Sequence, residues 1–312
     1  MISVVIPVYN EEKNIPALME RLLTVLESMK RPFEVILVDD GSKDDSLAIM
    51  RRYARRPGIK VVELTRNYGQ HAAIMAGFSL TKGEIVITLD ADLQNPPEEI
   101  PQLVQVMLEG NYDVVGTVRR VRRDSLFRII PSKAINYITR KITGVKMKDW
   151  GCMLRAYRRS VVEKMLACEE HATFIPALAT YFGKRVAEIE VSHEERHAGK
   201  SSYPLSKLIN LQFDLIAAFS SFPLKLLLYG GVGMACLGVV LGIVLVVARL
   251  CYGAAWAVEG VFTLFAVLFI FVGMQFFALG VIGEYIGRIY REVRKRPAYV
   301  IEEVYSVESE EK

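Results

Sequence analysis

Two glycine motifs that commonly bind phosphate are missing from this chain of 312 residues. Neither the Gly-x4-Gly-Lys-Ser/Thr of P-loop proteins nor the Gly-x-Gly-x-x-Gly of dinucleotide-binding folds occurs in it. Cysteines are few, four in all, and they lack the paired spacing of metal sites or disulfides, which is typical of a reducing compartment. The formal net charge of +4 is too small to indicate a nucleic-acid partner. Any phosphate-binding site must therefore be built from other residues.

Charged residues are absent from two long segments, 226–248 and 261–282, and each is long enough to cross a bilayer as a helix. Two such runs in tandem disfavour core helices of a soluble protein. Neither run lies at the N-terminus, so neither is a signal peptide. We therefore expect two transmembrane helices within residues 226–283.

The residues around these segments predict how the chain meets the membrane. Basic residues precede the first span and follow the second, whereas the connecting loop has only Arg249 against Glu259, so both termini are expected in the cytoplasm. Residues 204–225 have apolar residues at helical spacing and predict an amphipathic interfacial segment. Residues 284–312 are expected as a basic, then acidic, cytoplasmic tail. A Gly238-x-x-x-Gly242 pair hints at close helix packing in a homo-oligomer.

The N-terminal half alternates between predicted strands and helices. Apolar, β-branched runs at residues 2–8, 33–38, 59–64 and 84–90 read as buried strands, and helical patterns separate them. This alternation predicts an α/β domain over residues 1–203, with a mostly parallel sheet and helices on both faces.

Acidic residues follow two of these strands. Asp39 and Asp40 follow the second, and Asp90 and Asp92 follow the fourth. Ligands of open α/β sheets bind where the carboxyl ends of strands meet, and carboxylates suit a hard divalent cation that holds substrate phosphates. The alternative is a set of polar turns and helix caps, and Asp-x-Asp alone favours neither.

Several motifs together resemble one family. "VVIPVYNEE", "VDDGSKDDS", "NYGQHAAIMAGF" and "LDADLQNPPEEIP" are similar to those of family 2 glycosyltransferases with a GT-A nucleotide-sugar fold, in the branch that loads sugars onto polyprenyl phosphates. The resemblance continues through "DWGCMLRAYRR", both apolar segments and "GEYIGRIYREVRKRP". It implies an inverting transferase that moves a sugar from a UDP-sugar to undecaprenyl phosphate at the bacterial inner (cytoplasmic) membrane.

The resemblance also assigns roles to residues. A divalent cation, Mg²⁺ or Mn²⁺, is implied on Asp90, Asp92 and Gln94, with contact to ribose as an alternative role of Asp90. Packing of Tyr9 in the core and capping of a helix by Asp40 are the alternatives for those two residues. The residues implied to bind the nucleotide are Pro7, Tyr9, Asn10, Glu11, Asp39 and Asp40.

The acceptor phosphate is assigned to Arg128 and Ser132, which lie one helical turn apart, although a solvated basic face on anionic lipid is an equal alternative for any one arginine. Asp149 matches the presumed catalytic base. A phosphate monoester is mostly dianionic at pH 7, so Asp149 either deprotonates or only orients the acceptor, and a structural turn is the other reading.

Residues 193–203 resemble a lid with the pattern Arg-x-x-Gly-x-Ser-Lys-Tyr, which closes over the donor diphosphate. Arg196 matches this pattern, but Ser202 stands where the family usually has lysine. Lys200 is the nearest cation that can replace it.

The sugar implied by the motifs is 4-deoxy-4-formamido-L-arabinose, used in lipid A modification and cationic peptide resistance. A glucosyl or mannosyl transferase acting on the same lipid is the alternative within the class. From other classes, a membrane-anchored sugar-nucleotide binding protein or a flippase component stays open. The spans carry no ionisable residue at mid-depth, which disfavours transport.

Overall fold

The computed structural model describes residues 1–119, 152–168, 174–192, 222–252, 261–294 and 296–307. These residues belong to two compact units. The first comprises Met1–Pro204 and Pro297–Lys312, and the second comprises Leu205–Arg296.

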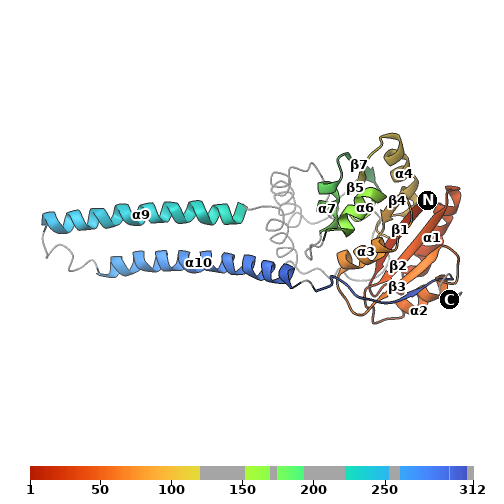
Figure 1. Ribbon diagram of the computed structural model, residues 1–312, viewed down its shortest axis with the longest axis horizontal. Coiled ribbons are helices and arrows are strands. Elements are labelled where there is room, and N and C mark those ends of the chain that lie inside the picture. The colour runs from red at the N-terminus through yellow and green to blue at the C-terminus, as the bar shows by residue number, and fades with distance from the viewer. Residues whose placement is uncertain (120–151, 169–173, 193–221, 253–260, 295, 308–312) are drawn as a thin grey trace. The chain divides into compact units, whose positions relative to one another are not determined.

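The first unit is built around an eight-stranded sheet with the order β7-β5-β6-β4-β1-β2-β3-β8 (Figure 1). Strands β1 to β4 run parallel to one another, as do β5 and β7, whereas β6 and β8 are antiparallel to their neighbours. The predicted α/β fold with a mostly parallel sheet is therefore confirmed. The strands are β1 Ile2–Val8, β2 Phe33–Asp39, β3 Ile59–Leu64, β4 Ile85–Thr88, β5 Val114–Arg119, β6 Arg155–Arg158, β7 Val186–Val191 and β8 Ile301–Tyr305.

Helices cover both faces of this sheet because the side chains of its central strands alternate between two apolar cores. In β1, Val4 and Ile6 join one core, while Val5 joins the other. The first core lies under α1 and α4, and the second lies under α3, α6 and α7 (Figure 1). The helices of this unit are α1 Ile15–Ser28, α2 Ser46–Tyr53, α3 Gln70–Ser79, η1 Pro97–Glu99, α4 Ile100–Glu109, α6 Arg159–Leu166 and α7 Ile175–Phe182.

The strand order reverses between β1 and β4. From β1 the chain proceeds to β2 and β3 on one side, and it then returns through α3 to place β4 on the other side of β1. Helix α3 passes close to the sheet on this return, because a Cβ at Gly77 would lie 2.3 Å from Val5 Cγ1. Such a reversal opens a crevice at the carboxyl ends of the two strands, where ligands of α/β sheets bind.

Strand β8 is the main departure from the sequence analysis, which treated residues 284–312 as a tail. Ile301–Tyr305 instead pairs antiparallel with β3 and covers the edge of the sheet. Its tyrosine anchors it, because Tyr305 Oη donates to Glu63 Oε2 at 2.8 Å and the Arg51 guanidinium lies 4.1 Å from the centre of the Tyr305 ring. The segment therefore completes the first unit of the fold.

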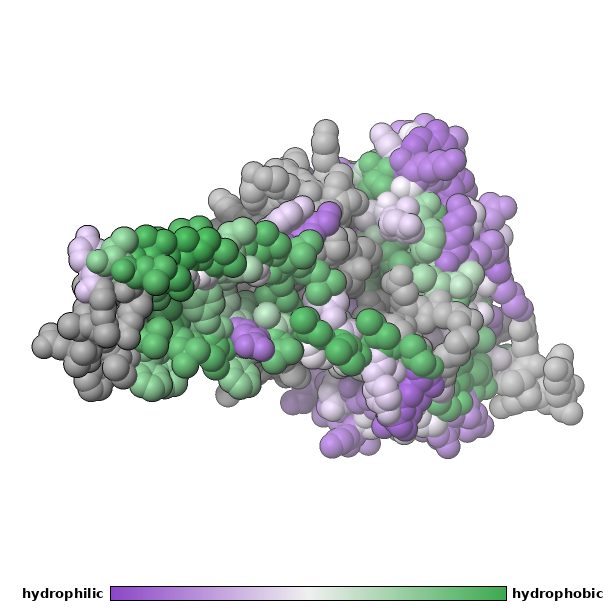
Figure 2. Space-filling view, turned by 60° about the vertical axis from the view of Figure 1, so that its left-hand side comes forward, coloured by the Kyte–Doolittle hydropathy of each residue, from purple (hydrophilic) through white to green (hydrophobic). Residues whose placement is uncertain are grey.

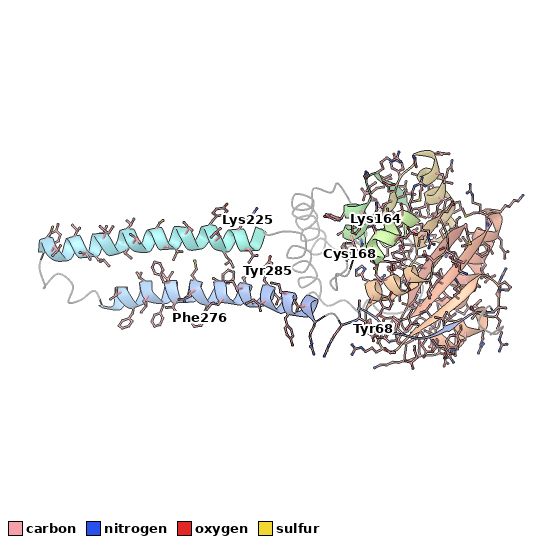
Figure 3. All side chains as sticks on the ribbon, in the orientation of Figure 1. Tyr68, Lys164, Cys168, Lys225, Phe276 and Tyr285 are labelled. Atoms are coloured by element: carbon pink, nitrogen blue, oxygen red, sulfur yellow. The ribbon has the colours of Figure 1, made fainter. Side chains whose placement is uncertain are left out.

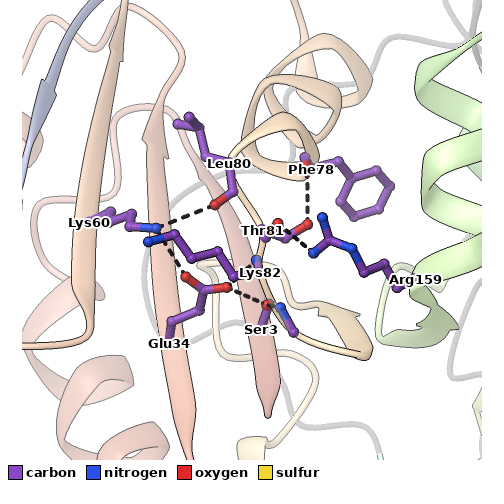
Figure 4. A network of polar contacts seen from close by, with 9 residues as sticks. Ser3, Glu34, Lys60, Phe78, Leu80, Thr81, Lys82 and Arg159 are labelled. Carbon is purple, nitrogen blue, oxygen red and sulfur yellow. Dashed lines mark hydrogen bonds and ion pairs between the residues drawn. The ribbon is translucent and has the colours of Figure 1, made fainter.

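A buried polar network lies at the amino ends of β1, β2 and β3 (Figure 4). Glu34, at the start of β2, accepts from Ser3 Oγ at 2.6 Å and from the backbone N–H of Lys82 at 2.5 Å, and it pairs with Lys60 Nζ at 3.1 Å. Burial works to raise the pKa of Glu34, but these hydrogen bonds and the Lys60 charge outweigh it and lower the pKa. The network lies near the amino ends of β1 and β2, away from the acidic strand ends, and it stabilises the fold.

The second unit contains α9 Phe222–Tyr252 and α10 Val261–Val293. Leu224–Tyr252 and Val267–Gly287 are long and apolar enough to cross a membrane, and neither stretch is buried in protein. Their surfaces are hydrophobic in Figure 2, and Phe276, labelled in Figure 3, is 70% exposed. Apolar surface on this scale is unfavourable in water and suits lipid. A Cβ at Gly238 would lie 3.3 Å from the ring of Phe271, so this glycine lets α9 approach α10.

Candidate active site

Asp39 lies at the last position of β2 and is 2% exposed. Its Oδ2 accepts a hydrogen bond from the backbone N–H of Ser42 at 3.2 Å, whereas its buried Oδ1 has no partner. Burial raises the pKa of Asp39, against the lowering effect of its hydrogen bonds with Ser42. A buried carboxylate oxygen without a donor is costly, so this atom is an acceptor available to a ligand N–H or O–H.

Asp40 has a different environment, although it is the next residue. Its two oxygens accept hydrogen bonds from the backbone N–H groups of Tyr68 at 2.7 Å and Gly69 at 2.9 Å. Burial raises the pKa of Asp40, while these two bonds lower it. Asp40 therefore fixes the loop that leads into α3, but it is not a helix cap, because the N-cap residues of α2 and α3 are Asp45 and Gly69.

The loop after β1 is tied to the loop after β2. Asn10 has a left-handed φ of 55°, which asparagine tolerates, and its Oδ1 accepts from the N–H of Lys43 at 2.7 Å. Glu11 donates its N–H to Ser46 Oγ at 2.9 Å. Pro7 is buried within β1, whereas Tyr9 is 42% exposed. The exposed ring beside Asp39's strand fits a stacking surface, and packing of Tyr9 in the core is not observed.

Asp90 lies just beyond β4 and is held by two side-chain amides. Gln70 Nε2 donates to its Oδ1 at 2.6 Å, and Asn95 Nδ2 donates to its Oδ2 at 3.3 Å. Asn95 is itself buried, and its Oδ1 accepts from Cys152 Sγ at 3.3 Å. Asp90 is thereby oriented by α3, by its own loop and by the segment before β6.

Asp92 lies in a tight turn with an unusual backbone. Its Oδ1 accepts from the N–H of Gln94 at 3.1 Å, and the intervening Leu93 is buried with φ 61°. A left-handed conformation is rare for a bulky residue and costs about 1 to 3 kcal/mol, a kind of strain that clusters at functional sites. The turn follows directly after Asp90, and its Asp92 and Gln94 side chains are both only partly buried.

The carboxylates at this edge can be tested for fit to a divalent cation. Among the described residues, no three His, Cys, Asp or Glu side chains converge as a complete metal cage. Mg²⁺ and similar ions in nucleotide enzymes are held by one or two carboxylates, and substrate phosphates and water complete the coordination. Asp90 and Asp92 supply carboxylates just after β4, and Gln94 follows in the same turn, so the chemistry of these residues fits that incomplete donor set.

Sequence reasoning missed two residues on the β6 side of Asp90. Arg155 is fully buried on β6, in register with Thr88 of β4, and its Nε donates to the backbone oxygen of Cys152 at 2.8 Å. His71, at the start of α3, packs edge-to-face on Phe174 with ring centres 5.2 Å apart. The motifs containing them were noted, but burial of these side chains depends on long-range contacts that a sequence does not display.

Other predicted residues cannot be compared with the structure. Arg128, Ser132, Asp149, Arg196 and Lys200 all lie outside the residues that the structure describes. The roles assigned to them remain predictions.

The parallel sheet, the strand reversal and the carboxylates after β2 and β4 define a nucleotide-sugar-dependent glycosyltransferase of the GT-A type. The chain belongs to glycosyl transferase family 2, because the sequence model of that family matches residues 3–166. Residues 222–289, which include most of α9 and α10, match a second family, the GtrB C-terminal hairpin. The resemblance stated from the motifs is thus confirmed.

Several relatives that share one enzyme name match nearly the whole chain. The undecaprenyl-phosphate 4-deoxy-4-formamido-L-arabinose transferase of Shewanella sediminis (strain HAW-EB3) is 54% identical over 97% of this chain and 92% of its own length. The protein of that name from Edwardsiella ictaluri (strain 93-146) is 55% identical over 97% of this chain and 94% of its own. Among solved structures, glucosyl-3-phosphoglycerate synthase from Mycobacterium tuberculosis, in complex with Mn²⁺, UDP-glucose and phosphoglyceric acid, covers 70% of this chain and 77% of its own at 22% identity and a TM-score of 0.50. At that identity the likeness concerns the fold alone.

Proposed function

We propose that this protein transfers 4-deoxy-4-formamido-L-arabinose from its UDP-linked form to undecaprenyl phosphate, for modification of lipid A. The observation that carries this proposal is the identity of 54 to 55% with transferases of that name over 97% of the chain, spans included. Identity over the whole length favours a shared acceptor lipid as well as a shared nucleotide fold.

The nucleotide end of the donor is assigned to the ends of β1 and β2. The unpartnered Oδ1 of Asp39 accepts a hydrogen bond from the uracil N–H or a ribose hydroxyl, and Tyr9 offers an exposed ring just after the neighbouring strand β1. The loops after these strands are braced against each other, so the surface is formed before the nucleotide arrives.

The diphosphate is assigned to Asp90, Asp92 and Gln94 through Mg²⁺ or Mn²⁺. When bound, this ion supplies Lewis-acid stabilisation to the departing UDP. Support comes from the incomplete donor set at this edge, and from a solved enzyme of similar fold that holds Mn²⁺ with UDP-glucose. Gln70 and Asn95 keep the Asp90 carboxylate oriented throughout.

The reaction is a single displacement with inversion. An oxygen of the acceptor phosphate attacks the anomeric carbon, the bond from that carbon to the UDP oxygen breaks, and UDP leaves with the electron pair. Arg128 and Ser132 are proposed to hold the acceptor phosphate, Asp149 to orient or deprotonate it, and Arg196 and Lys200 to cover the donor diphosphate. We propose that α9 and α10 lie in the bacterial inner membrane and that both termini are cytoplasmic. We also propose that the protein forms a homo-oligomer.

The proposal is tested with the purified full-length chain in lipid nanodiscs. UDP release from UDP-4-deoxy-4-formamido-L-arabinose should require undecaprenyl phosphate, and the product should be the glycosylated lipid phosphate by mass spectrometry. UDP-glucose is the matched donor control and should give little release. Efficient transfer from UDP-glucose, with none from the formamido sugar, would favour the glucosyl transferase alternative instead.

A further inference from the structure

His71 carries a polar atom that nothing in the site so far uses. Its Nδ1 is buried and has no hydrogen-bond partner, although its ring is held edge-to-face against Phe174. A buried nitrogen without a hydrogen-bond partner is unfavourable, and native proteins retain few of them. His71 follows Gln70, whose amide binds Asp90, at the start of α3, so it lies at the same edge of the sheet.

The order of the strands indicates which part of the donor lies near this ring. Across the carboxyl edge the order is β2, β1, β4 and β6, with Asp39 after β2, Asp90 after β4 and Arg155 on β6. Three strand spacings of about 4.8 Å make roughly 14 Å, which suits a nucleoside diphosphate sugar laid along the edge. With the nucleoside at β1 and β2 and the diphosphate at β4, the sugar falls at β6.

His71 lies toward that end of the edge, because the charge of Arg155 on β6 acts on its ring. Burial, together with the positive charge of Arg155, lowers the pKa of His71 to about 4, so the ring is neutral at physiological pH. A neutral imidazole accepts at one nitrogen and donates at the other, which matches hydroxyl and amide groups. Phosphate oxygens accept only, so they match just the donating nitrogen of the ring.

We propose that His71 is a specificity-determining residue whose Nδ1 hydrogen-bonds a polar substituent of the donor's sugar ring. The inference rests on the proposed function, because it takes the donor to be a UDP-sugar. Phe174 fixes the ring plane, and Gln70 links the same turn of α3 to Asp90. Selection of the sugar is thus coupled to placement of the diphosphate.

Three substitutions distinguish hydrogen bonding by the His71 Nδ1 atom from packing by the ring. His71→Phe keeps the packing on Phe174 and removes both nitrogens, His71→Asn retains a polar atom near Nδ1, and His71→Gln retains one near Nε2 instead. The full-length variants in nanodiscs are compared for kcat/KM with the UDP-sugar that the wild type uses best, for binding of UDP alone by calorimetry, and for thermal unfolding.

His71→Phe and His71→Gln should lower kcat/KM by roughly 10- to 100-fold, the loss expected when one partner of a buried hydrogen bond is removed and the other is left unpaired. UDP contains the nucleoside and diphosphate but no sugar, so its Kd should stay within about twofold, and His71→Asn should recover most of the activity. Equal losses for UDP and UDP-sugar, or full activity in His71→Phe, would overturn the inference. If the wild type rejects the formamido sugar, the proposed function fails, while the comparison on its preferred donor still tests His71.

Discussion

Replacing Asp39 with asparagine tests whether the buried carboxylate is kept for binding at the expense of stability. The substitution preserves the side-chain shape and an oxygen for the Ser42 N–H, but it removes the charge from the unpartnered side. A hydrogen bond from a ligand to a charged acceptor contributes about 1.5 to 3 kcal/mol, so the Kd for UDP should rise about 10- to 150-fold.

The stability of the unliganded protein should move in the opposite direction. Burial raises the pKa of Asp39 in the folded state above that of the unfolded chain. The folded protein therefore binds a proton on Asp39 more tightly than the unfolded chain does. As the pH rises through the range between the two pKa values, Asp39 ionises and the free energy of unfolding falls. Asp39→Asn removes this penalty, so its melting temperature near pH 7 should equal or exceed that of the wild type.

The assay is isothermal calorimetry with UDP between pH 4 and pH 8, together with thermal unfolding of the same samples. Wild-type affinity should weaken as the pH falls through the raised pKa of Asp39, and the variant should lack this part of the pH dependence. Asp40→Asn is the matched control, because both oxygens of Asp40 bind backbone N–H groups, and this variant should lose stability. A lower melting temperature with unchanged UDP affinity in Asp39→Asn would refute the reasoning.

Three further predictions follow from the site and the core. Asp92→Asn should reduce turnover on the order of 10²-fold, and chelation should abolish wild-type activity until Mg²⁺ or Mn²⁺ is restored; full turnover in excess chelator would contradict this. Glu34→Gln should lower the free energy of unfolding by about 3 kcal/mol, because it removes the charged partner of Lys60. Folding lowers the pKa of Glu34, so the stability that this carboxylate contributes to the wild type should be lost as the pH falls. Thermal unfolding at a series of pH values measures both effects. Gly77→Ala should lower stability by about 1 to 3 kcal/mol, since its Cβ would overlap Val5, and an unchanged melting temperature would count against the close packing of α3.

Much of the sheet was predictable because its central strands are nearly continuous apolar runs. Residues 2–8, 33–38 and 59–64 formed strands as expected, since buried parallel strands leave a strong local pattern. The short strand β6, Arg155–Arg158, contains two arginines and a tyrosine, so its sequence gives no such pattern. It forms because it pairs with β4 and β5, which is a long-range contact.

The sequence predicted a site at the acidic ends of β2 and β4, but it did not predict which carboxylates hold the fold and which are available to a ligand. Asp39 and Asp40 look equivalent in the sequence, yet one keeps an oxygen unpartnered and the other binds two N–H groups of a loop 28 and 29 residues away. Likewise His71 reads as an ordinary polar residue near a helix start. Only the packing of Phe174 and the neighbouring charge of Arg155 distinguish it.

The position of β8 has a consequence for how the protein is made. Strand β3 ends at Leu64 and its edge partner begins at Ile301, 237 positions later, beyond both apolar helices. At roughly 5 to 20 residues per second of synthesis, the edge of β3 waits on the order of 10 to 50 s for its partner. An unpaired apolar strand edge is a template for aggregation during that time. Completion of the sheet is therefore coupled to translation of the two long apolar helices, and the chain reaches its finished fold only after both have been synthesised.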